Sequence, residues 1–143
     1  MSSSRIIQLS IGLAIAVALA LPLPAAGAQG TDRGCYVAKA GKRKTSLGAH
    51  QWTVRQEVRW CAETRAGRRR ITAAERRASV RTGTNWRLLS RSGEIRRRGA
   101  RFVAESRFHF RLRYPYFEQN CYPRIEIKVW PSGRWARSVA TGC

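Results

Sequence analysis

Apolar and polar side chains alternate strictly in two long stretches, and this pattern restricts the fold more than any other feature of the chain. From Trp52 to Trp60, every second residue (Trp, Val, Gln, Val, Trp) belongs to one set, and the residues between are Thr, Arg, Glu and Arg. From Phe102 to Arg113, Phe, Ala, Ser, Phe, Phe and Leu alternate with Val103 and then with the charged and polar residues Glu, Arg, His, Arg and Arg. Successive side chains of a β-strand point to opposite faces, so a period of two predicts strands with one buried face.

Shorter segments around these two stretches add further strands. Residues 86–89 form a short predicted strand, followed by an arginine-rich connection that contains Gly93 and Gly99. Residues 69–82 carry a helix-capping pattern, Thr72 to Glu75, but no apolar stripe at helical spacing, so a strand is favoured over a helix. Residues 29–50 are rich in Gly, Lys, Ser and Thr and are expected to form an irregular lead-in.

A hairpin is predicted at the end of the chain. Ile125, Ile127 and Val129 alternate with charged residues, the turn is Pro131-Ser132-Gly133, and residues 135–139 return. Together, about six short strands separated by Gly, Pro and Ser turns predict an all-β protein, a small antiparallel β-sandwich or barrel.

The first 28 residues have the three parts of a secretory signal peptide. Arg5 precedes an apolar run from Ile6 to Leu21, and two prolines lead to the small-residue site Ala26-Gly27-Ala28. The run is shorter than the roughly 20 residues that a membrane-spanning helix needs. Cleavage near Ala28 is therefore predicted to release a secreted single domain, residues 29–143, which is β-rich.

The four cysteines, Cys35, Cys61, Cys121 and Cys143, all lie in this mature part. An even number in an exported chain predicts two disulfides, whereas the absence of any CxxC spacing argues against a zinc site. In the predicted hairpin register, Cys121 faces Cys143, which leaves Cys35 to pair with Cys61. The pairing Cys61–Cys121 with Cys35–Cys143 remains an alternative. We expect no metal and no cofactor.

The mature chain is strongly basic. Without Arg5 it has 27 Lys and Arg against 8 Asp and Glu, a formal charge of +19. Such a surface attracts polyanions without sequence preference, by releasing their counterions. The predicted contact residues are the local arginine clusters and the arginines on one strand face: Arg68, Arg69, Arg70, Arg96, Arg97, Arg98, Arg107, Arg111 and Arg113. The abundance of Arg and Ala is what GC-rich codons favour and indicates a bacterial source.

Two other sets of residues are candidates for roles of their own. Glu57 and His109 fall on the polar faces of the two long strands and, with an arginine, supply the residue types of a small secreted ribonuclease. Of the five tryptophans, Trp52, Trp60 and Trp86 lie in apolar registers and are expected in the core. Trp130 and Trp135 flank the hairpin turn and are expected to be exposed contact residues.

The layout of residues 52–135 resembles that of a loose group of small secreted actinobacterial proteins of unknown function. The shared features are Trp60-Cys61 before a glycine turn at Gly67, a middle strand with Trp86, and Pro123-x-Ile-x-Ile-x-Val129 before Gly133. This resemblance implies a β-rich fold and no particular activity.

These observations lead to one main hypothesis, a secreted, disulfide-braced domain that binds anionic surfaces or polymers without catalysis. The partners expected outside a bacterium are a cell-wall polymer such as teichoic acid, lipid headgroups, nucleic acid or an acidic protein. One alternative is a small ribonuclease-like enzyme or toxin that uses Glu57 and His109. Another is an inhibitor or interaction protein that presents a loop such as residues 90–100. A further alternative is a charged, soluble surface without a dedicated ligand.

Overall fold

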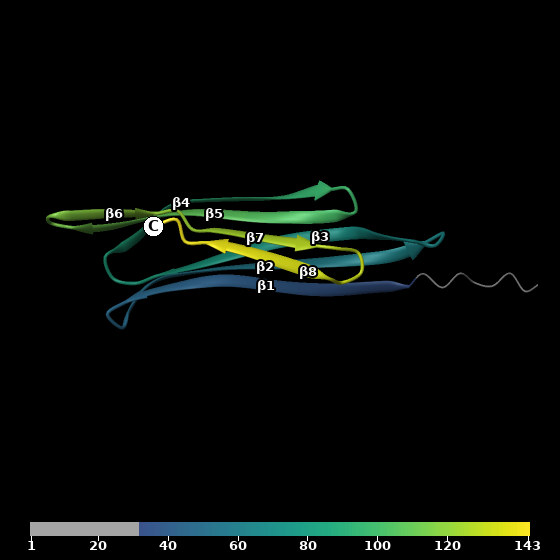
Figure 1. Cartoon of the computed structure of the whole chain (residues 1–143), viewed down its shortest axis with the longest axis horizontal. Helices are drawn as coiled ribbons and strands as arrows, with labels where there is room; N and C mark the ends of the chain where they lie inside the picture. The colour runs from purple at the N-terminus through teal and green to yellow at the C-terminus, as the bar shows by residue number, and fades with distance from the viewer. Residues whose placement is uncertain (1–31) are drawn as a thin grey trace, which may run out of the picture.

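The computed structural model describes residues 32–143, so the predicted signal peptide lies outside the described residues. Two antiparallel sheets stack face to face (Figure 1). Sheet A has the order β1-β2-β3, and sheet B has the order β4-β5-β7-β8 with β6 paired to β5. The strands are β1 (Arg33–Ser46), β2 (Ala49–Arg65), β3 (Arg68–Thr82), β4 (Trp86–Arg98), β5 (Arg101–Tyr114), β6 (Phe117–Cys121), β7 (Arg124–Val129) and β8 (Trp135–Ala140). The predicted all-β class is confirmed in its sandwich form, with eight strands where about six were predicted.

The core lies between the sheets and is built from the two alternating stretches. On β2, the side chains of Trp52, Val54, Gln56, Val58 and Trp60 are all buried, as the period of two predicts. Every second side chain of β5 from Ala104 to Leu112 is buried in the same core, on the inner face of sheet B. No helix within residues 32–143 is long and apolar enough to cross a membrane.

Specific contacts join the two sheets across this core. The Trp52 and Phe110 rings stack with centroids 5.3 Å apart and planes 4° from parallel. The buried Gln56 side chain donates a hydrogen bond from Nε2 to the Ala104 carbonyl at 2.9 Å. Trp86, at the start of β4, is also buried, so the prediction of three core tryptophans is confirmed.

Three expectations from the sequence are wrong in detail. The lead-in is not irregular, because residues 33–46 form β1, whose inward positions are the small residues Ala38 and Ala40. β4 extends to Arg98, so residues 90–98 are strand and not a presented loop. Gly93 lies within β4 and does not interrupt it. A Cβ there would lie 2.5 Å from Cζ of Arg76, so the missing side chain leaves room for that guanidinium. A short strand, β6, follows the turn at Pro115-Tyr116 and was not predicted.

Residues 69–82, for which helix and strand were both considered, form the strand β3. It pairs with β2 along its whole length, with Val54 opposite Val80 and Trp60 opposite Ala74. The absence of a helical apolar stripe was therefore the better guide than the capping pattern at Thr72.

The two disulfides connect the pairs favoured from the sequence, Cys35–Cys61 and Cys121–Cys143. Cys35 and Cys61 are directly opposite each other on β1 and β2. Cys121 ends β6, and the backbone of the next residue, Tyr122, donates to the Gly142 carbonyl at 2.9 Å, which holds the chain end beside it. Two disulfides and the absence of free cysteines in the described part indicate an oxidising, extracellular environment.

Each sheet edge carries a charged residue on its inward-facing register. Lys44 on β1, Arg76 on β3, Arg91 on β4 and Arg137 on β8 are directly opposite the buried residues Trp52, Val58, Phe108 and Ile127. Inward-pointing charges on edge strands prevent the exposed edges from pairing with another chain. Part of the basic composition is therefore explained by the fold itself.

Candidate polyanion-binding site

The nine arginines predicted to bind polyanions are not equivalent in the structure. Arg69 is bound within the protein, because its guanidinium donates to the Pro131 carbonyl at 2.9 Å, to Asp32 at 2.8 Å and to the Tyr36 hydroxyl at 2.7 Å. Arg96, Arg107 and Arg111 form ion pairs with nearby glutamates. The other five form no ion pair within residues 32–143: Arg68, Arg70, Arg97, Arg98 and Arg113.

Every carboxylate side chain is already paired. All 8 Asp and Glu residues lie in the described part of the chain, and each is within ion-pair distance of a Lys or Arg. These pairs involve 11 of the 27 Lys and Arg residues of that part, which leaves 16 without a carboxylate partner. A surface where several such unpaired cations lie together is therefore a candidate site for an anion.

Five of these unpaired cations, together with three paired ones (Lys39, Arg59 and Arg77), line a hollow on the outer face of sheet A with a volume of about 1150 Å³. We call it the sheet A hollow. It is lined by eight cations and a single carboxylate, that of Glu57. The cations are Lys39, Lys42, Arg43, Arg55, Arg59, Arg77, Arg81 and Arg137.

The register of the three strands explains the shape of the hollow. Arg55 on β2 is opposite Gly41 on one side and Ser79 on the other, and these two small residues form the floor. In the next row, Thr53 is opposite Arg43 and Arg81. Arg43, Arg55 and Arg81 therefore lie on three adjacent strands, which are about 4.8 Å apart, and they surround a narrow patch of the floor.

Hydrogen-bonding groups lie beside these arginines at the end of the hollow. A ring nitrogen of His50, Nε2, is 2.9 Å from the Thr53 hydroxyl. Neither Arg43, Arg55 nor Arg81 has an ion-pair partner in the described range 32–143. Guanidinium groups with free N–H donors bind phosphate and carboxylate oxygens in a bidentate manner, so this patch suits an anion.

Glu57, the one carboxylate of the hollow, is held in its ionised form. Hydrogen bonds from Arg59 and then from Lys39 lower the pKa of the Glu57 carboxyl, and burial opposes them only in part. The Lys39 Nζ lies 3.2 Å from Glu57 Oε2. A general base that works near neutral pH needs a raised pKa, so this environment does not prepare Glu57 for that role.

The structure does not bring Glu57 and His109 together. Glu57 lies on the outer face of sheet A, whereas His109 lies on the outer face of sheet B, with the core between them. His109 is instead engaged locally, with Nε2 2.9 Å from Oδ1 of Asn120 and its ring stacked on Tyr122. The expectation that the two residues meet on one sheet surface is wrong, because their strands belong to different sheets.

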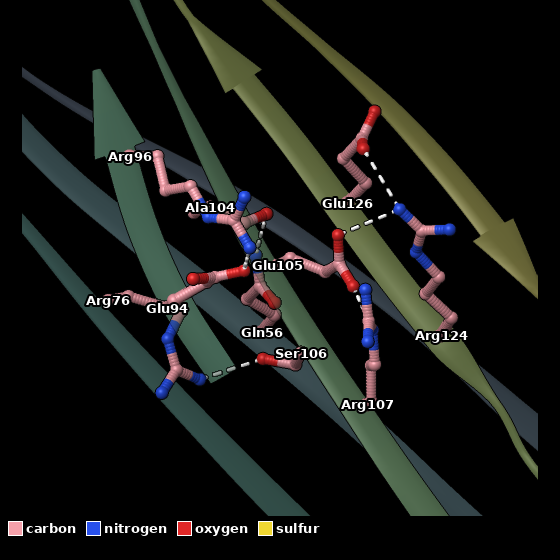
Figure 2. A network of polar contacts seen from close by, with 10 residues as sticks. All are labelled: Gln56, Arg76, Glu94, Arg96, Ala104, Glu105, Ser106, Arg107, Arg124 and Glu126. Carbon is pink, nitrogen blue, oxygen red and sulfur yellow. Dashed lines mark hydrogen bonds and ion pairs between the residues drawn. The ribbon is translucent and has the colours of Figure 1, made fainter. Parts of the chain in front are cut away.

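The outer face of sheet B compensates its own charge (Figure 2). Glu94, Glu105 and Glu126 are directly opposite one another on β4, β5 and β7. Arginines from the adjacent rows neutralise this acidic row, with Nη2 of Arg124 2.7 Å from Oε2 of Glu105. Burial raises the pKa of Glu105, but hydrogen bonds from Arg107 and Arg124 outweigh it and hold the pKa below its usual value. This face is therefore a weaker candidate for binding anions than the sheet A hollow.

The two tryptophans expected to be exposed differ from each other. Trp135 is 40% exposed, as expected. Trp130 is only partly exposed, and its carbonyl accepts a hydrogen bond from Nε1 of Trp60 at 3.0 Å. The guanidinium of Arg134 lies 4.6 Å from the Trp130 ring centroid, a cation–π contact within the protein.

No group of three or more His, Cys, Asp or Glu residues among residues 32–143 is arranged to hold a metal ion. The sheet A hollow offers cations and hydroxyl groups, a lining that would suit an anion.

Comparison of the chain with protein-family models, with curated proteins and with solved structures gives no match.

Sequence reasoning missed the cations of the sheet A hollow because they form no run along the chain. Six of the eight occur as pairs four residues apart, Lys39 with Arg43 on β1, Arg55 with Arg59 on β2, and Arg77 with Arg81 on β3. The other two are Lys42 on β1 and Arg137 on β8. Residues i and i+4 of a strand share one face, so each pair was readable as a basic strand face. Their convergence depends on the pairing of the three strands.

Proposed function

We propose that this protein is an exported basic domain that binds anionic polymers or surfaces through charge, with the sheet A hollow as its main contact. The predicted signal peptide and the two disulfides support a role outside the cytoplasm. The single observation that carries the proposal is the gathering of eight cations, five of them without a carboxylate partner in the described chain, around a hollow whose one carboxylate is already paired.

The physical basis is counterion release. A phosphate polymer that lies along the hollow contacts Arg43, Arg55 and Arg81. Binding breaks no ion pair of these arginines, because they form none within residues 32–143. Each phosphate contact releases condensed counterions from the polymer, so binding weakens as salt is added. If about five phosphates of duplex DNA are engaged, log affinity falls with log salt at a slope of about −4 to −5. Contacts of this kind read charge and not base sequence.

Two matched triple variants test the location of the contact. Arg43→Gln with Arg55→Gln and Arg81→Gln removes three charges from the hollow. Arg68→Gln with Arg70→Gln and Arg98→Gln removes three equally unpaired charges near the β2–β3 and β4–β5 turns. All six side chains are exposed, so neither variant disturbs the core.

We expect the hollow variant to reduce the salt slope by about 2 to 3, because each lost phosphate contact reduces it by roughly one. The control variant should change it less. The measurement is a titration of duplex DNA and of a polyglycerol phosphate, each at low and high salt, by fluorescence anisotropy. A salt-independent affinity, or tight binding to only one of the two polymers, would contradict binding by charge.

A further inference from the structure

Large apolar side chains are exposed at two hairpin tips. The β1–β2 turn carries Leu47, and the β5–β6 turn carries Tyr116 followed by Phe117. Leu47 and Tyr116 are fully exposed, and Phe117 is more than half exposed. Leu47 also has φ of 48°, a conformation for which Asn, Asp or Gly is favoured. This leucine thus contributes neither to the core nor to a relaxed turn.

Both tips lie at the same end of the elongated molecule (Figure 1). The contacts just behind them agree, since Lys44 on β1 lies 5.7 Å from the Trp86 ring centroid, and Trp86 is opposite Leu112 on β5. We call this end, with the two turns and the strand ends beside them, the tip end. The other end has no fully exposed large apolar side chain: Ala66-Gly67 and Gly99-Ala100 are small residues, and beside the β7–β8 turn Trp130 is partly buried and Trp135 is 40% exposed.

The tip end is also rich in unpaired cations. Five exposed Lys and Arg residues of its strand ends form no ion pair within the described chain: Lys42, Arg43, Arg81, Arg87 and Arg113. Its one carboxylate, Glu118, is 3.2 Å from Arg111. The acidic row of sheet B and Glu57, Glu63 and Glu75 of sheet A lie further from the tips along their strands. Six unpaired arginines also lie near the turns of the other end, Arg68, Arg70, Arg97, Arg98, Arg101 and Arg134, so the tip end is distinguished by having cations together with fully exposed apolar side chains.

We infer that the tip end docks onto a lipid bilayer that contains anionic lipids, with Leu47, Tyr116 and Phe117 entering the interface. Aromatic side chains favour the boundary between headgroups and acyl chains, and the long arginine and lysine side chains reach the lipid phosphates around them. A few apolar side chains alone bind a membrane weakly, and a basic patch supplies the second attraction that stable binding requires.

This inference rests on the proposed function and narrows its anionic partner to a lipid surface. A soluble polyanion needs only the cations, and nothing in its chemistry rewards a fully exposed leucine or phenylalanine. The apolar residues occur on two separate tips with cations between and behind them, an arrangement that suits a charged interface more than a continuous apolar protein partner.

The test uses the mature protein and sedimentation with vesicles of phosphatidylcholine, alone or mixed equally with phosphatidylglycerol. The variant Leu47→Asn with Tyr116→Ser and Phe117→Ser removes the apolar tips and no charge. Leu47→Asn alone is the variant that does not strain the β1–β2 turn, because Asn is favoured at positive φ. Val37→Thr, which alters an exposed apolar residue in the middle of β1 remote from both tips, is the matched control.

We expect the wild type to prefer the anionic vesicles, and the triple tip variant to lose about tenfold in affinity for them. Leu47→Asn should lose part of that, and Val37→Thr should match the wild type. All variants should bind soluble duplex DNA as the wild type does, because their cations are intact. Vesicle binding that survives removal of the tips, or wild type that binds DNA but not anionic vesicles, would overturn the inference and leave the proposed function in place. Failure of the wild type to bind DNA in a salt-dependent way would overturn the proposed function and the inference with it.

Discussion

The two disulfides allow a quantitative prediction, because they differ in surroundings but close chain segments of similar length. Cys35 and Cys61 are 26 residues apart and lie within the long β1–β2 ladder. Cys121 and Cys143 are 22 residues apart and hold the end of the chain. In the chain-entropy description, a bridge stabilises by restricting the unfolded chain, and the gain depends only on segment length. Each bridge is then worth about 3.5 kcal/mol, although their native environments are unlike.

Removing the bridges as pairs should therefore destabilise by similar amounts. Cys35→Ser with Cys61→Ser should cost about 3.5 kcal/mol, because both side chains are partly exposed and leave no cavity. Cys121→Ala with Cys143→Ala should cost about 1 kcal/mol more, since Cys121 is fully buried and its sulfur also packs in the core. Guanidinium unfolding of the three oxidised proteins, followed by tryptophan fluorescence, gives the free energies.

The result that would refute this reasoning is a loss below about 1 kcal/mol for the β1–β2 bridge. That outcome would mean that the ladder around Cys35 and Cys61 already persists in the unfolded chain, so that the bridge has little left to restrict.

Three further predictions follow from single positions. Glu105 has a lowered pKa in the folded state, so its ion pairs stabilise the fold fully at pH values above the pKa of a free glutamate, about 4.3. This contribution is lost as the pH falls through the pKa of the folded state. Glu105→Gln should therefore flatten the loss of stability in acid, measured by urea unfolding between neutral and acid pH. Gly133→Ala should cost about 3 kcal/mol against about 1 kcal/mol for Gly48→Ala, because both glycines have positive φ but only at Gly133 would a Cβ meet a side chain, 2.5 Å from the Tyr36 ring; equal thermal unfolding midpoints would contradict this. Mature protein from culture medium should begin at or within a few residues of Gln29, and an intact mass that retains Met1 would contradict the predicted cleavage.

The sequence predicted the fold wherever side chains of the inward register are large and apolar. Trp52 to Trp60 and Phe102 to Leu112 gave both the strands and their buried faces. The terminal hairpin register, fixed by a three-residue turn, also placed Cys121 opposite Cys143, and that bridge is present. Where the inward positions are alanine, glycine or arginine, as in β1 and β4, the period of two is invisible to hydrophobicity, and both strands were missed or shortened.

The candidate site was harder to predict, for a reason of a different kind. Adjacent arginines such as Arg96 to Arg98 are conspicuous in the sequence, but neighbours along a strand point to opposite faces and cannot form one patch. Arg96 is paired with Glu94, and Arg97 donates to the Gly99 carbonyl. Arg43, Arg55 and Arg81 do share a face, but they lie on three different strands, so only the pairing of β1, β2 and β3 brings them together.

The cations of this protein fall into two groups, those that contribute to the stability of the fold and those that remain free to bind a ligand. Each of the eight carboxylates is matched to a cation, and the inward cations at Lys44, Arg76, Arg91 and Arg137 protect sheet edges. Those uses do not account for Arg43, Arg55 and Arg81, which gather on one outer face and repel one another in the folded state. Like charges that are held together by a fold destabilise it unless a ligand neutralises them. A polyanion should therefore raise the thermal unfolding temperature, and the hollow variant, free of that repulsion, should be at least as stable as wild type without a ligand and gain less when the polymer is added.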